Sequence, residues 1–127
     1  MASKQGNGSG ETLIFTCAGA AHSGQVANRA GLQLRQEGVG TLFCTAAVAA
    51  EIPDKLERAR NAKRRIVIHG CKDRCCGKIM AKVGMPVDLH VPLCDLGIEK
   101  QPAEPSLIND ARKVVEHVLS WLENADA

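Results

Sequence analysis

Aromatic residues are scarce in this chain of 127 residues, which has two Phe, one Trp and no Tyr. Proteins that bind single-stranded nucleic acid stack the bases on aromatic side chains and follow the phosphate backbone with a basic groove. Here 16 Lys and Arg face 14 Asp and Glu, so the net charge is only +2. This balance excludes a strong generic attraction to nucleic acid, and we expect no nucleic-acid partner.

Long apolar runs are also missing. No stretch approaches the roughly 18 uninterrupted apolar residues that indicate a membrane-spanning helix. The segment 1–10, MASKQGNGSG, lacks the apolar core of a secretory signal peptide, and its composition predicts a disordered tail. We therefore expect no contact with a membrane and a location in the reducing cytoplasm. The length predicts a single domain, over residues 11–127.

Short apolar runs alternate with helical spacing along this domain. The predicted strands are 12–16, 41–43, 64–69 and 88–93, and the predicted helices are 23–36, one that begins at Pro53, 75–83 and 107–124. The core of the third strand, Ile66–Ile68, is continuously apolar, as in strands that are buried on both faces. Strands separated by helices predict a parallel sheet with right-handed crossovers. We expect a small three-layer α/β fold with the flavodoxin-like or Rossmann-like strand order 2-1-3-4.

Cysteine, in contrast, is frequent, with six in the chain. Each predicted strand ends at or near a cysteine, in the order Cys17, Cys44, Cys71 and Cys94. The carboxyl ends of parallel strands share one edge of the sheet, where such folds bind their ligands. Four thiols that are far apart in the sequence are therefore expected to converge. In a reducing compartment, clustered cysteines more often bind metal or carry out redox chemistry than form disulfides.

A denser group of cysteines lies around the end of the third strand. Cys75 and Cys76 open a predicted helix, where unpaired N–H groups and the helix dipole favour thiolate over thiol. Lys72 and Arg74 add positive charge beside them. Thiolates select Zn²⁺, Cu(I) or iron–sulfur clusters over Mg²⁺ and Ca²⁺. Cys76 falls on the apolar face of its helix, so we expect it in the core rather than among the ligands.

Four motifs in the same order resemble the DGC domain family of bacteria and archaea, which is named for a central Asp-Gly-Cys sequence. They are Cys17-Ala18-Gly19, the middle cysteine Cys44, His69-Gly70-Cys71 with Cys75 four positions on, and Asp95-Leu96-Gly97-Ile98-Glu99-Lys100. The resemblance covers about residues 14–100. One departure is that His69 stands where the family has Asp.

The resemblance implies a zinc ion bound by four cysteines, here Cys17, Cys44, Cys71 and Cys75. It implies a ligand but no pathway, because the cellular role of the family is generally unknown. The positions of Cys76, Cys94, His22 and His69 leave open whether any of them joins the site. We therefore expect a metal-binding protein that handles or senses zinc, with an iron–sulfur cluster or Cu(I) as alternatives on the same ligands.

Two other functions fit parts of the sequence. A thiol-dependent redox enzyme would use Cys71 or Cys75 as the nucleophile and a neighbouring thiol to resolve the mixed disulfide. The loop from Cys17 to Gly24 also resembles the phosphate-binding loops of low-molecular-weight tyrosine phosphatases and of sugar-phosphotransferase IIB domains. The phosphatase loop needs an Arg six residues after its cysteine, and Ser23 occupies that position. Phosphoryl transfer is therefore the less favoured function.

Overall fold

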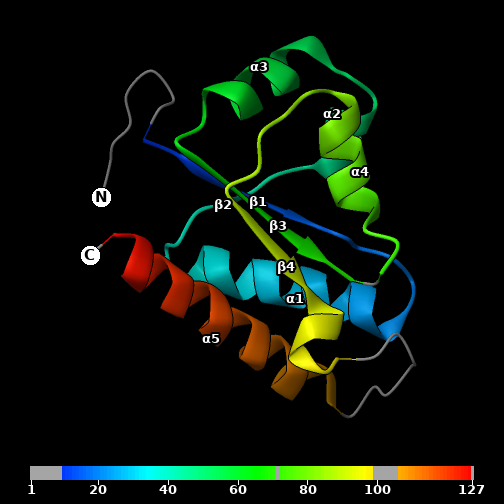
Figure 1. The fold of residues 1–127 in the computed structure, drawn as a ribbon, viewed down its shortest axis with the longest axis vertical. Coiled ribbons are helices and arrows are strands. Elements are labelled where there is room, and N and C mark those ends of the chain that lie inside the picture. Colours follow the sequence, from blue (N-terminus) through cyan, green and yellow to red (C-terminus); the bar gives the residue numbers. More distant parts are fainter. Residues whose placement is uncertain (1–9, 71, 99–105, 127) are drawn as a thin grey trace.

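The computed structural model describes residues 10–70, 72–98 and 106–126. These residues form a parallel four-stranded sheet in the order β2-β1-β3-β4, with helices on both faces (Figure 1). The predicted fold class and strand order are confirmed. The predicted tail lies outside the described residues except for Gly10. No helix in the described ranges is long and apolar enough to cross a membrane.

The elements follow one another as strand and helix along the chain. The strands are β1 (Thr12–Thr16), β2 (Thr41–Leu42), β3 (Arg64–His69) and β4 (Leu89–Pro92). The helices are α1 (His22–Gln36), α2 (Thr45–Ala49), α3 (Pro53–Asn61), α4 (Cys75–Lys82) and α5 (Leu107–Ala125), with a 3₁₀ turn η1 (Leu93–Leu96) after β4. The short helix α2 was not predicted, because five residues carry too little periodicity. The fourth strand is shorter than predicted, since Leu93 already belongs to η1.

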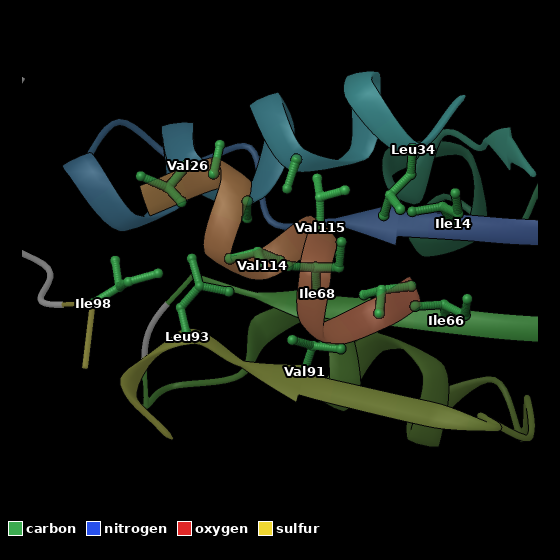
Figure 2. Packing of buried hydrophobic residues seen from close by; sticks show 14 of the residues in the cluster. Ile14, Val26, Leu34, Ile66, Ile68, Val91, Leu93, Ile98, Val114 and Val115 are labelled. Carbon is green, nitrogen blue, oxygen red and sulfur yellow. The ribbon is translucent and has the colours of Figure 1, made fainter. Parts of the chain in front are cut away.

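Two apolar layers enclose the sheet. On one face, helices α1 and α5 pack on the side chains of β1, β3 and β4, including Ile14, Ile68 and Val91 (Figure 2). On the other face, α2, α3 and α4 cover Phe15 and Val67. Because successive residues of a strand point to opposite faces, a strand between two helical layers needs apolar residues throughout. This explains the continuous apolar runs of β1 and β3.

The strands β1 and β3 end at the same level. Thr16 pairs with Ile68, and the backbone N–H of Cys17 donates a hydrogen bond to the carbonyl oxygen of Ile68 (3.1 Å). On the other side of β1, the N–H of Phe43 donates to the carbonyl oxygen of Ile14 (2.8 Å), which extends the pairing to the residue before Cys44. The strand order reverses between β1 and β3, and such reversals open a binding crevice at the carboxyl edge.

Leu34 of α1 is fully buried between the helix and the sheet, so its truncation tests the packing of this layer. We expect Leu34→Ala to lower the free energy of unfolding by about 2–5 kcal/mol, because the lost apolar contacts leave a cavity. Ile108→Ala is the control, since that side chain is 54% exposed. It should change stability by less than about 0.5 kcal/mol. Urea denaturation measures both variants, and equal losses would contradict the assigned core.

Candidate functional site

Four cysteines line one cavity of ≈ 570 Å³ at the carboxyl edge of the sheet: Cys17, Cys44, Cys75 and Cys76. The walls come from the ends of β1 and β2 and from the first turns of α2 and α4. The lining residues therefore place the cavity beside β1 and β2, between the sheet edge and the helices α2 and α4. Figure 1 shows that α2 and α4 lie on the same face of the sheet. Four thiols from different positions in the sequence thus line one open cavity.

Cys17 and Cys44 are placed by neighbouring strands. Cys17 follows β1 directly and is half-buried, whereas Cys44 follows β2, begins α2 as its N-cap residue and is exposed. The hydroxyl of Thr45 donates a hydrogen bond to the carbonyl oxygen of Thr16 (3.4 Å). This contact ties the start of α2 to the end of β1, so the two cysteines stay on the same side of the sheet edge.

The other two thiols come from the start of α4. Arg74 precedes this helix with a left-handed backbone (φ 52°), a conformation that costs a non-glycine residue about 1 kcal/mol or more. Cys75 is exposed and Cys76 is 3% exposed. The pKa of the Cys76 thiol is raised to about 11, chiefly by burial. The charges of Cys17 and Cys75 also raise it, and a hydrogen bond with Thr45 lowers it. Without a ligand, Cys76 therefore remains a protonated thiol.

Glycines permit the close approach of the loops around Cys17. A Cβ added to Gly70 would lie 3.0 Å from the Cα of Gly24 and 3.3 Å from the Sγ of Cys17. A Cβ on Gly24 would lie only 2.6 Å from the carbonyl oxygen of Gly19. The end of β3, the loop after β1 and the first turn of α1 thus meet at Cys17 because Gly24 and Gly70 have no side chains.

The structure brings three of the four expected ligands to the cavity, namely Cys17, Cys44 and Cys75. The fourth, Cys71, lies outside the described residues. Within the described part of the chain, no three His, Cys, Asp or Glu side chains lie close enough together, as they stand, to hold a metal ion. The donor chemistry fits a soft metal, since several thiols share one opening. A zinc site on the expected set depends on Cys71.

Cys94 lies apart from the cavity lining. Cys94 is exposed on η1, and its Sγ lies 3.9 Å from the Oδ1 atom of Asp95. Its place after the fourth strand follows the predicted pattern, but β4 is at the far end of the sheet from β2. The distance across the sheet separates Cys94 from the thiols that follow β1 and β2.

His69, which stands in the central motif, is buried at the end of β3. Its Nε2 shares a hydrogen bond with Nδ1 of His90 (2.9 Å), and the two rings are stacked. The pKa of His69 is lowered to about 4, chiefly by burial and also by the charges of His90 and Arg74. This pair was not predicted, although strand alternation places both residues on one face of the sheet: His69 aligns with Pro92, two positions after His90.

His22, the other histidine considered as a ligand, joins two helices. Its Nε2 lies 3.0 Å from an Oδ2 of Asp110, and the hydroxyl of Ser106 donates to the same carboxylate oxygen (3.0 Å). The hydrogen bond with His22 contributes most to holding the pKa of Asp110 below its ordinary value. Because His22 begins α1 and Asp110 lies in the first turn of α5, the pair anchors the helix that follows the Cys17 loop.

The buried histidine makes the stability of the metal-free protein sensitive to acid. Below an ordinary pKa of 6.5 the unfolded chain binds a proton at His69, but the folded protein does so only near pH 4. We expect the free energy of unfolding to fall by about 2–3 kcal/mol from this residue between pH 7 and pH 4. Urea denaturation at several pH values should show a shallower loss for His69→Gln. His117→Gln, at an exposed position, should keep the original slope, and equal slopes in all three proteins would contradict the assignment.

Comparison with known proteins identifies the family. The family model of the DGC domain matches residues 13–118, which include all four expected ligands. The chain is also similar to the anaerobic and virulence modulator AnvM of Pseudomonas aeruginosa. The two are 26% identical over 102 residues, which cover 80% of this chain and 78% of that protein. No solved structure matches the chain significantly. The protein belongs to the DGC domain family.

Proposed function

We propose that this protein binds zinc through the thiolates of Cys17, Cys44, Cys71 and Cys75. The proposal is carried by one observation: three of these cysteines, from three separate parts of the chain, line the same cavity. Cysteines that serve only as small core residues are usually buried among apolar side chains. Here Cys44 and Cys75 are exposed and Cys17 is half-buried, so simple core packing does not account for their convergence.

The surroundings suit a cluster of negative thiolates. Four thiolates around Zn²⁺ carry a net charge of about −2, which needs positive partners nearby. Cys75 is the first residue of α4, where the unpaired N–H groups of the helix start favour negative charge. Arg74 precedes it, and its charge reaches far enough to lower the pKa of both His69 and His90. When bound, zinc supplies a positive centre that keeps its cysteine ligands deprotonated.

Metal handling or sensing is the role that this arrangement favours. Four thiolate ligands leave no open position for a zinc-bound water, which argues against hydrolysis. The exposed thiols at the opening can be reached by a partner or by a competing ligand. The relative in Pseudomonas aeruginosa is named as a modulator, which agrees with a regulatory role. The cytoplasm, where thiols stay reduced, is the location that this function requires.

A redox enzyme is the second candidate, and the exposure of Cys75 at the start of α4 favours it. A thiolate of Cys75 would attack a sulfur of a substrate disulfide, form a mixed disulfide and release one substrate thiolate. The thiolate of Cys71 would then displace the second. The substrate gains two electrons, and Cys71 and Cys75 are left oxidised as a disulfide. This chemistry needs no metal.

Metal content separates the two candidates. We expect untagged protein, purified anaerobically under reducing conditions without chelator, to contain about one zinc per chain by elemental mass spectrometry. Cys17→Ser and Cys71→Ser should each lose most of this metal, because serine is a poor ligand for zinc. Cys94→Ser is the matched control and should retain it, since Cys94 lies outside the cavity lining.

Two other results would change the conclusion. Colour in the anaerobic protein, with iron or copper in place of zinc, would assign the same thiols to an iron–sulfur cluster or to Cu(I). A wild-type protein that contains no metal and cycles between dithiol and disulfide would contradict the zinc proposal. It would establish the redox function instead.

A further inference from the structure

A second cavity, of ≈ 460 Å³, lies between α1 and α5, the two helices on the opposite face of the sheet from α2 and α4 (Figure 1). Arg29 and Leu32 of α1 line it, together with Ile108 and Arg112 of α5. Residues three or four positions apart lie on the same side of a helix, so each helix contributes one ridge. The two ridges form a groove that shares no lining residue with the cysteine-lined cavity.

The helices on either side of this groove are held in place by their inner surfaces. Leu34 of α1 and Val114 and Val115 of α5 belong to the apolar layer on the sheet, and each is at most 2% exposed. The side chains of the groove belong to the outer surfaces of the same helices. A partner can therefore bind in the groove without disturbing the core.

The groove presents apolar surface to the solvent. Ile108 is 54% exposed, more than any other large apolar side chain among the residues that the structure describes. One exposed isoleucine on a protein surface needs no explanation by itself. Here, however, Ile108 lines a cavity together with the partly buried Leu32. The two side chains offer a place for an apolar group of a binding partner.

The charged groups of the groove are predominantly positive. Within the described ranges, neither Arg29 nor Arg112 has an ion-pair or hydrogen-bond partner for its guanidinium group. Glu37 also lines the groove, but its carboxylate accepts a hydrogen bond from the side-chain amide of Gln33 (2.9 Å). Two arginines against one glutamate leave a net charge of +1 on the lining. A free guanidinium fork suits a carboxylate, so the groove is complementary to an acidic partner.

We propose that this groove binds an acidic segment of a partner protein, with an apolar side chain against Ile108 and Leu32 and carboxylates on Arg29 and Arg112. Pockets for small molecules bury most of their ligand. Here Ile108 and both arginines are exposed, so the groove is open and suits a peptide instead. Amphipathic helices commonly bind in grooves of this kind. The inference is independent of the zinc proposal, because no cysteine lines the groove.

Fluorescence anisotropy tests the proposal with a labelled amphipathic peptide of about 15 residues, with leucine along one face and glutamate beside it. We expect this peptide to bind at least about ten-fold more tightly than a peptide with lysine in place of glutamate. Arg29→Glu and Arg112→Glu should each weaken binding at least about ten-fold, because each replaces an attraction with a repulsion. Ile108→Ala should weaken it about three-fold or more, since apolar contact is lost.

Arg35→Glu is the matched control. Arg35 is an exposed residue of α1 outside the groove lining, and its substitution makes the same change in net charge. It should alter binding by less than about three-fold. Losses as large for Arg35→Glu as for Arg112→Glu would assign the effect to net charge alone and overturn the inference. Equal binding of the two peptides, or binding of neither, would also overturn it.

Two measurements on the wild-type protein do not depend on the folding of a variant. In NMR titrations, the acidic peptide should shift the backbone amide signals of Arg29, Ile108 and Arg112 and leave those of Cys44 and Cys75 in place. The reverse pattern would contradict the proposed groove. Sedimentation without peptide should show monomers. A dimer that Arg112→Glu dissociates would assign the groove to a second copy of the chain and overturn the proposal of an acidic partner.

Discussion

The strands β1 and β3 end side by side at the carboxyl edge of the sheet, and the candidate site depends on this alignment. Their parallel register continues through Thr16 and Ile68 and closes with the hydrogen bond from the N–H of Cys17 to the carbonyl oxygen of Ile68. Since every strand in the sheet is parallel, each following loop must leave from the same edge. The cavity therefore follows from topology, and the cysteines need no local Cys-x-x-Cys pairing to meet.

The two apolar layers hold this edge in place. The layer of α1 and α5 fixes the loop after β1, because α1 begins at His22 and His22 is bonded to Asp110 of α5. The opposite layer fixes α4 through Cys76 and Met80. The rims of the cavity are thus anchored from both faces of the sheet. Movement of either layer would alter the spacing of the thiols, which links the stability of the core to the geometry of the site.

The sequence was sufficient to predict the strand order and the shared edge of Cys17 and Cys44, whereas Cys94, which was expected to join them, lies apart from the cavity. Both correct predictions depend on patterns that are local or that follow from the rules of parallel sheets. It was not sufficient for contacts between distant residues, such as the pairing of His22 with Asp110, 88 positions apart. Cys76 shows the same limit on a finer scale. The apolar spacing of the helix predicted its burial correctly, but the cavity beside Cys76 depends on how α2, β1 and α4 pack together.

The positive charge beside the candidate site does not come from a histidine. Burial keeps His69 neutral at physiological pH, so it adds no charge of its own. The positive potential comes instead from Arg74, held at the start of α4 in a left-handed conformation, and from the unpaired N–H groups of that helix. Such a fixed potential attracts negative charge, whereas burial raises the pKa of the Cys76 thiol and keeps that thiol protonated in the absence of a ligand. Cys75 adjoins Arg74 in the chain and is exposed, so this potential acts at the opening of the cavity.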